Sequence, residues 1–197
     1  MTCTESEIAV TRQVDGTELP AAGIWTIDPR HTELAFIGRH FMLTKVRGRF
    51  TGVSGAIRIT EDPADSTAEV RIDMSSVESG NGARDDHLKS ADFFDTANYP
   101  TARFSGRVAR WHGAHGQLQG ELTVRDITRP LTLDVEYSGY AADPWGGHRA
   151  VFAAAATLNR EDWGLTWNMP LDNGGLLVSK EIRIEIEMEA MLEAPAA

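Results

Sequence analysis

Six histidines are the residues of this sequence best suited to chemistry, because imidazole binds metal ions and exchanges protons near neutral pH. His31, His40 and His87 lie in polar or mixed segments from which their side chains could converge. Their spacing does not favour a metal site, since the sequence has no His-Glu-x-x-His motif, no two histidines four residues apart, and a single cysteine, Cys3. We therefore expect no resident metal and predict that the histidines are hydrogen-bonding or surface residues.

The motifs of nucleophilic and phosphate chemistry are missing as well. There is no Gly-x-Ser-x-Gly elbow, and Ser105 lies in a strand-like run instead of a strand-to-helix turn. The glycine-rich stretch at 79–82 lacks the Lys-Ser/Thr ending of a phosphate-binding loop. Carboxylates are abundant, and neighbours such as Asp85 and Asp86 are expected by chance on a solvated face. We expect no catalytic residues.

Aromatic and methionine side chains gather in segments that do not alternate cleanly between apolar and polar residues. Such side chains suit either a ligand pocket or an ordinary core, and aromatic residues are common in cores. The group comprises Phe41, Met42, Phe93, Phe94, Tyr99, Trp163, Trp167 and Met169. The pattern by itself leaves both interpretations open.

Composition and charge indicate the class of protein and exclude some kinds of partner. A chain of 197 residues with 42% hydrophobic residues predicts one domain with a sizeable core and excludes a disordered chain. With 19 basic and 29 acidic residues the net charge is -10, which repels phosphate backbones, so we expect no nucleic-acid partner. The segment from Met1 to Ala22 has no apolar run of about seven residues, and no stretch approaches roughly 18. We therefore expect no secretory signal, no transmembrane segment and a cytoplasmic location.

Period-two alternation predicts that the fold is built from antiparallel strands. The clearest run is Ile182 to Ala190, in which apolar residues alternate with arginine and glutamate. The runs Ala68–Met74 and Leu131–Tyr137 alternate in the same way, so each has one solvated face. Less regular runs contain Trp25 with Ile27, Leu34 with Phe36, Phe50 through Ile59, Ala102 with Phe104, Leu118 with Val124, and Val151 to Leu158. These are nine candidate strands, of which one is allowed to be a fragment.

Turn signals between the runs, and the scarcity of helix, favour an antiparallel meander. Only Ala83 to Ser90 has a helical pattern, with Asp85 and Asp86 in its first turn. Strands without alternating helices exclude a Rossmann fold and must pack as two sheets or close into a barrel. The pattern does not choose between these, but glycines inside the strand runs permit strong curvature and favour the barrel.

Ordered motifs run from about Gly23 to Ala190. They are Trp25-Thr26-Ile27-Asp28-x-x-His31-Thr32-x-Leu34-x-Phe36 with Arg39-His40, then Gly48-x-Phe50, then Arg84-Asp85-x-His87-Leu88-x-Ser90-x-Asp92-Phe93-Phe94-Asp95 with Tyr99-Pro100, then Thr128-x-Pro130-Leu131, and Asn159-Arg160-x-Asp162-Trp163-Gly164. This series resembles the YceI-like proteins. The resemblance implies an all-β fold, an eight-stranded antiparallel lipocalin-like β-barrel with one or two short helices over residues 23–191. It leaves 1–22 as a partly disordered extension and 192–197 as a disordered tail.

The resemblance also implies a lipophilic small-molecule partner, such as a polyisoprenoid, an isoprenoid quinone or a fatty acyl compound, with no cofactor required. An eight-stranded barrel is about the size that holds one such ligand. On the cavity wall or at its mouth we place Phe36, Phe41, Met42, Phe50, Phe94, Phe104, Phe152, Trp163 and Trp167. Four basic residues are candidates for a polar headgroup, namely Arg39, His40, Arg84 and His87. The equal alternative is a hydrogen-bonded network that closes one barrel end and comprises Asp28, His31, Arg84 and Asp85.

Three functional hypotheses follow from the sequence. The leading one is non-enzymatic binding, transport or storage of a long-chain amphiphile. The second is an enzyme that acts on an isoprenoid or quinone lipid with His40 or His87 as general acid or base. The third is an interaction module in which the barrel is only a scaffold. The charged faces of the alternating strands leave room for a symmetric homodimer.

Overall fold

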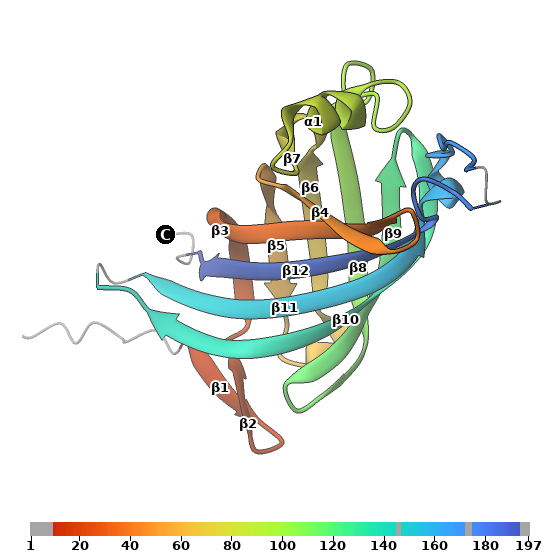
Figure 1. The fold of residues 1–197 in the computed structure, drawn as a ribbon. Coiled ribbons are helices and arrows are strands. Elements are labelled where there is room, and N and C mark those ends of the chain that lie inside the picture. Colours follow the sequence, from red (N-terminus) through yellow and green to blue (C-terminus); the bar gives the residue numbers. More distant parts are fainter. Residues whose placement is uncertain (1–9, 145–146, 172–174, 194–197) are drawn as a thin grey trace, which may run out of the picture.

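A computed structural model of the chain describes residues 10–144, 147–171 and 175–193. Its main feature is a closed barrel of eight antiparallel strands (Figure 1). In barrel order these are β3 (Gly23–His40), β5 (Val53–Ile59), β6 (Thr67–Asp73), β8 (Thr101–His112), β9 (His115–Val124), β10 (Ile127–Ala142), β11 (His148–Asn159) and β12 (Glu181–Leu192), which pairs again with β3. Strands β4 (Thr44–Phe50) and β7 (Val77–Glu78) extend the sheet beside β3. The predicted eight-stranded antiparallel barrel is confirmed.

Strand β3 is long enough to pair with two different strands along one of its edges. Its first part pairs with β5 through residues 23–26, and its last part pairs with β4 through residues 34–40. On its other side it pairs with β12, with a register shift between Met188 and Ala190. Figure 1 shows the strand bent between its two parts. The separate sequence runs around Trp25 and Leu34 therefore belong to one strand, whereas the run from Phe50 to Ile59 is divided between β4 and β5.

Helix α1 (Gly82–Lys89) covers one end of the barrel (Figure 1) and confirms the helix predicted at 83–90. The side chain of Asn81 caps it by accepting a hydrogen bond from the Arg84 amide at 3.1 Å, and two basic side chains in its last turn suit the helix dipole. Three short 3-10 segments complete the structure, namely η1 (Pro63–Asp65), η2 (Met74–Ser76) and η3 (Arg160–Trp163).

No helix in the described part of the chain combines the length and the hydropathy needed to cross a membrane.

The N-terminal extension contains a hairpin that the sequence did not predict. Strands β1 (Thr11–Val14) and β2 (Thr17–Pro20) pair around the turn residues Asp15 and Gly16, whose φ angles are 48° and 80°. An Asp-Gly pair favours such a turn because both residues tolerate positive φ. Leu19 of β2 is buried and packs with the barrel core. The rest of the predicted disorder falls on residues 1–9 and 194–197, which lie outside the described residues, so for them it stays a prediction.

Two separate hydrophobic clusters lie inside the barrel. One cluster includes Trp25, Tyr137 and Phe152. Leu192, which we expected in a disordered tail, is the last residue of β12 and packs against this cluster. The other includes Phe50 together with residues of β3, β5, β6 and β8, namely Leu34, Val53, Ile72 and Ala102. Successive inward residues of the same strands belong to different clusters, since Ile184 packs on the second and Met188 on the first. The clusters therefore occupy opposite parts of the barrel axis.

Candidate functional site

An apolar cavity of about 420 Å³ lies in the part of the barrel that contains Phe50. This volume falls within the roughly 300–1,000 Å³ typical of small-molecule sites. Six of the residues predicted for the wall do line it, namely Phe36, Phe50, Phe94, Phe104, Trp163 and Trp167. Their contact with a ligand stays a prediction.

Period-two alternation explains how the strands build this wall. On β12 the residues Ile182, Ile184 and Ile186 line the cavity. Between them Arg183 and Glu185 are on the outer face, where their side chains form an ion pair at 2.8 Å. Because successive residues of a strand point to opposite faces, the same sequence pattern that predicts the strand also supplies an apolar wall and a charged exterior.

Aromatic rings line one side of the cavity. The rings of Phe36 and Phe50 have centroids 5.6 Å apart, and Phe94, from the loop after α1, lies 5.5 Å from Phe50 and 6.2 Å from Phe36. Trp163 is held in place by its indole N–H, which donates a hydrogen bond to the carbonyl of Leu122 at 2.9 Å. The ring contacts join β3, β4 and the loop after α1, and the hydrogen bond of Trp163 joins η3 to β9.

The helical end of the cavity is covered by His87, Phe93 and Trp167. The His87 ring lies 4.5 Å from Trp167 and 5.1 Å from Phe93, centroid to centroid, and both contacts are close to perpendicular. Nε2 of His87 is 2.8 Å from the carboxylate of Asp92. Sequence reasoning assigned His87 and Trp167 to this region but left Phe93 between pocket and core, because its neighbours in sequence do not alternate.

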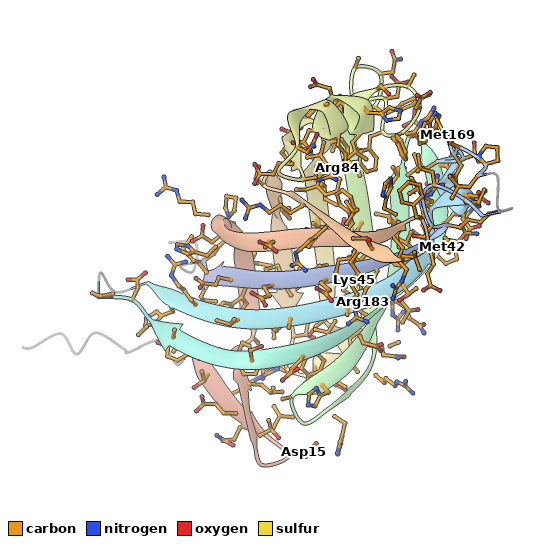
Figure 2. All side chains as sticks on the ribbon, viewed as in Figure 1. Asp15, Met42, Lys45, Arg84, Met169 and Arg183 are labelled. Atoms are coloured by element: carbon orange, nitrogen blue, oxygen red, sulfur yellow. The ribbon has the colours of Figure 1, made fainter. Side chains whose placement is uncertain are left out.

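All four predicted headgroup residues border the cavity. Arg39 and His40 come from the end of β3, and Arg84 and His87 come from α1. Figure 2 shows Arg84 on this helix. Its guanidinium is held by Ser79, with Nε 2.7 Å from the hydroxyl and Nη2 2.8 Å from the carbonyl oxygen. The geometry places basic groups near one end of an otherwise apolar space, and their role toward a headgroup stays a prediction.

A fifth basic residue on the wall, Arg160, was missed. Its side chain is buried, and burial lowers the pKa of the guanidinium from its ordinary value. Nε donates to the carbonyl of Ser179 at 2.9 Å, and Nη1 donates to the carbonyl of Leu165. The sequence carried one signal for it, its place in the motif that ends with Trp163, but nothing in the pattern indicates that this arginine turns inward.

Three of the residues that we placed on the cavity wall or at its mouth are not among the residues that line the cavity. Phe152 packs in the other cluster, with its ring 5.4 Å from that of Tyr137, because its position on β11 is too far along the barrel axis. Phe41 and Met42 form the turn between β3 and β4, and each is 49% exposed. Backbone hydrogen bonds connect this turn to Leu177 and Leu177 to Met169, so Met42 and Met169 lie at the same end in Figure 2.

The turn between β3 and β4 is strained, and this strain gives a testable prediction. Phe41 and Met42 have φ angles of 53° and 61°, where bulky residues cost about 1–2 kcal/mol each and Asn-Gly is preferred. The double variant Phe41→Asn with Met42→Gly is expected to raise the free energy of unfolding by about 1–2 kcal/mol in urea titrations. Asp15→Asn, in a turn that is already Asp-Gly, serves as the control and should change it by less than about 0.5 kcal/mol. A lower stability of the double variant would show that the Phe41 contact with the His40 ring, at 4.1 Å, outweighs the strain.

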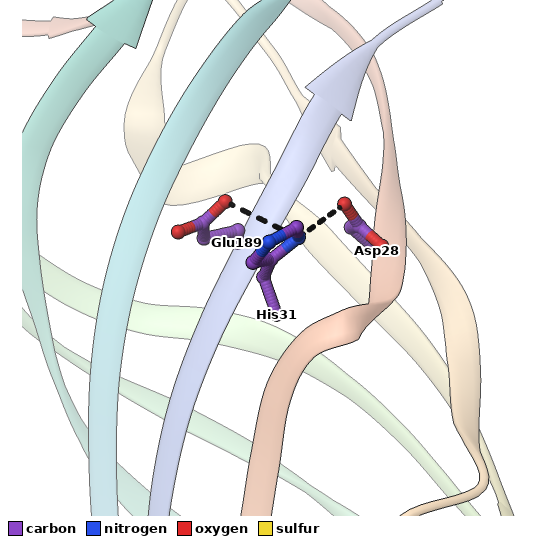
Figure 3. A group of neighbouring side chains, drawn as sticks. All are labelled: Asp28, His31 and Glu189. Carbon is purple, nitrogen blue, oxygen red and sulfur yellow. Dashed lines mark hydrogen bonds and ion pairs between the residues drawn. The ribbon is translucent and has the colours of Figure 1, made fainter. Parts of the chain in front are cut away.

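A second polar cluster lies away from the cavity, at the bend of β3 (Figure 3). Nδ1 of His31 is 2.9 Å from Asp28 and 3.9 Å from Glu189, and Nη1 of Arg149 is 2.5 Å from Asp28 and 3.1 Å from Glu189. Burial raises the pKa of the Asp28 carboxyl, but hydrogen bonds from Arg149, His31 and the Arg30 amide outweigh it and lower the pKa to about 2. The ion pairs of this cluster connect β3, β11 and β12.

This cluster revises the network considered from sequence. Asp28 and His31 do contact each other, but Arg84 and Asp85 belong to the separate group around Ser79, and among the described residues no hydrogen bond joins the two groups. The ligand atoms of Asp28, His31 and Glu189 lie within 4.8 Å of one another, which is close enough for a metal ion. Arg149 already supplies a cation to both carboxylates, so the arrangement is that of an ion-pair network.

Comparison with known proteins agrees with this architecture. The model of the YceI-like domain matches residues 25–190. A UPF0312 protein of Staphylococcus aureus strain N315 is 32% identical over 167 residues, covering 84% of this chain and 95% of the relative.

Solved structures share the barrel. BcnA of Burkholderia cenocepacia has a TM-score of 0.71 at 20% identity, covering 83% of this chain and 98% of that chain. The YceI protein of Campylobacter jejuni has a TM-score of 0.67 at 26% identity, covering 79% and 90%. A polyisoprenoid-binding domain from Saccharophagus degradans has a TM-score of 0.62 at 15% identity, covering 88% and 100%. From the match across its barrel and the identity to its relatives, the chain belongs to the YceI-like family.

Proposed function

We propose that this protein binds one long-chain amphiphile in the barrel cavity and carries or stores it without changing it chemically. The observation that carries the proposal is the 420 Å³ space enclosed by aliphatic and aromatic side chains, with basic residues near one end. Such a space suits a ligand with an apolar tail and a polar head. The candidate classes are polyisoprenoids, isoprenoid quinones and fatty acyl compounds.

The hydrophobic effect supplies the affinity in this proposal. Each buried methylene contributes about 0.8 kcal/mol, so a tail of about fifteen buried carbons nominally gains about 12 kcal/mol. Ordering the chain and restricting the ligand offset several kcal/mol of this gain. The remainder is enough for a ligand to stay bound through purification. One of the structures that share this fold is a polyisoprenoid-binding domain, which makes polyisoprenoids the first ligands to test.

Binding is better supported than catalysis, although one observation favours an enzyme as the second candidate. His87 borders the cavity and is 2.8 Å from Asp92, a pairing that could support a general base. Among the described residues the cavity wall contains no cysteine or lysine that would act as a nucleophile. It does contain the hydroxyl of Ser79, but within the described part of the chain this group forms hydrogen bonds with Asp85 and Arg84 and none with His87.

Native mass spectrometry of the purified protein tests the proposal. We expect a mass increase equal to one ligand per chain, and release of an intact long-chain lipid on denaturation. A bare mass that persists after incubation with polyprenyl lipids, quinones and fatty acids would contradict the proposal. Recovery of a supplied lipid with altered mass would favour the enzyme. The same spectrum reports whether the chain forms the homodimer for which its charged strand faces leave room.

A further inference from the structure

Arg160 differs from the other basic residues of the cavity because it is buried without a carboxylate partner. Its side chain is 3% exposed. Two of its nitrogens donate to the carbonyls of Ser179 and Leu165, whereas Nη2 is buried and has no hydrogen-bond partner. The adjacent acid Glu161 forms its ion pair with Lys180, at 2.9 Å, and no carboxylate of the described residues pairs with Arg160.

This state of Arg160 is costly for the empty protein. A buried donor without an acceptor loses its hydrogen bonds to water and gains none in the protein, which costs free energy. Burying a charge without a counter-charge costs more free energy still. The two carbonyls satisfy hydrogen bonds but carry no net negative charge. The ring of Phe93, whose centroid lies 5.9 Å from the guanidinium carbon, adds a weaker cation–π attraction. The carboxylate of Glu161 attracts the guanidinium electrostatically but makes no ion pair with it, so burial still lowers the pKa of Arg160. One donor therefore stays without an acceptor, and the positive charge on the cavity wall is compensated only in part.

The other ionisable residues around the cavity also favour an anionic group on the ligand. Every ionisable side chain among the described lining residues is basic, namely Arg39, His40, Arg84, His87 and Arg160. The chain as a whole has a net charge of -10, so this basic lining is the opposite of its average surface. His87 is paired with Asp92 and Arg84 is held by Ser79, which leaves Arg160 as the buried cation that most needs an anion.

We propose that the ligand carries an acidic headgroup, a carboxylate or a phosphate, which accepts a hydrogen bond from Nη2 of Arg160 while the tail occupies the apolar cavity. The inference rests on the proposed function, because it needs an amphiphile in the cavity. It narrows the ligand class, since fatty acids and polyprenyl phosphates meet this requirement and neutral quinones and alcohols do not. Either oxyanion can accept the one charge-assisted hydrogen bond that Nη2 has left to give, because Nε and Nη1 already donate to carbonyls.

Matched ligand pairs on the wild-type protein test the inference without any risk to folding. Palmitic acid is compared with hexadecanol, and geranylgeranyl phosphate with geranylgeraniol, by titration followed through tryptophan fluorescence. We expect each acid to bind at least about tenfold more tightly than its alcohol. Equal affinities within a pair would overturn the inference and leave the proposed function intact, whereas no binding of any of the four compounds would overturn both.

Inorganic phosphate distinguishes a lipid headgroup from a free anion. We expect phosphate at millimolar concentration to leave bound palmitic acid in place, because it gains nothing from the apolar cavity. Displacement of the lipid by phosphate alone would overturn the assignment of Arg160 to a lipid headgroup.

Variants then assign the preference to this side chain. Arg160→Gln is expected to lower the affinity for each acid to that of its alcohol, with the affinity for the alcohols unchanged within about twofold, and Arg160→Lys should keep part of the preference. Lys180→Gln removes an exposed positive charge nearby and should keep all of it. An undiminished acid preference in folded Arg160→Gln would overturn the inference. If that variant does not fold, the wild-type ligand pairs still decide.

Discussion

Replacing Leu158 with tryptophan is expected to weaken lipid binding about thirtyfold while the barrel stays folded. Leu158 lies on β11 and lines the cavity, so a larger indole would occupy space that the tail needs. Excluding two or three methylenes costs about 2 kcal/mol, which corresponds to a loss of affinity of about thirtyfold. Because the cavity is unfilled by side chains, the usual cost of overpacking a dense core does not apply in full. Native mass spectrometry and titration with a long-chain lipid measure the loss.

The neighbouring residue provides the matched control for this prediction. Thr157 is exposed on the same strand, and successive side chains point to opposite faces, so Thr157→Trp adds the same indole outside the barrel. This variant should keep the affinity of the wild type. Wild-type affinity in Leu158→Trp, or equal losses in both variants, would show that the lipid does not use this cavity.

Replacing Asp28 with asparagine is expected to lower the free energy of unfolding by about 2–3 kcal/mol at neutral pH. The carboxylate receives hydrogen bonds from Arg149, His31 and the Arg30 amide, at 2.5, 2.9 and 3.0 Å, and only 8% of its side chain is exposed. Breaking a buried ion pair costs about 3–5 kcal/mol, but Arg149 keeps Glu189 as a partner and so recovers part of this. Urea unfolding curves of the two proteins measure the difference.

The pH dependence of this difference identifies its cause. The pKa of Asp28 is lowered to about 2 in the folded protein, from an ordinary value of 3.8. Because a lowered pKa means that the folded state favours the ionised form, its contribution to stability is full above about pH 4 and is lost as the pH falls toward 2. The gap between wild type and Asp28→Asn should therefore be constant from neutral pH to about 5 and then close.

Asp134→Asn is the control for this pH profile. Asp134 is exposed and accepts a hydrogen bond from Gln117 at 2.7 Å, so its removal changes one surface carboxylate without disturbing an ion pair among the described residues. We expect a change below about 0.5 kcal/mol for this variant. A gap for Asp28→Asn that does not close in acid would assign its effect to lost packing instead of charge.

Alternation in the sequence was sufficient to predict the strands and their apolar faces, whereas the closed barrel was implied by the resemblance to the YceI-like proteins. The spacing of Ile182, Ile184 and Ile186 indicates both a strand and its inward face, because a pleated strand has a side-chain period of two. The helix at 83–90 was equally visible, because its polar run with Asp85 and Asp86 in the first turn is a local signal. These features depend on residues within one element, so the sequence contains all the information that they need.

Position along the barrel axis could not be read in the same way. Phe104 and Phe152 both alternate with small or polar neighbours, yet Phe104 lines the cavity and Phe152 packs with Tyr137 in the other cluster. A period of two specifies a face but not a height, and height depends on the register between strands that are far apart in sequence. The apolar residues Phe41 and Met42 likewise had the composition of a wall but fell in a turn.

The charged contacts depended most on tertiary structure. Arg149 is 121 residues from Asp28 and meets it because β11, β12 and β3 are neighbours in the closed barrel. Arg160 is buried and meets carbonyl acceptors from Leu165 and from Ser179, which is 19 residues away. Sequence alternation predicted the apolar face of each strand, because that pattern is local. The position of the buried charge in the cavity wall required the folded chain, because burial and partners come from segments that the pattern does not relate.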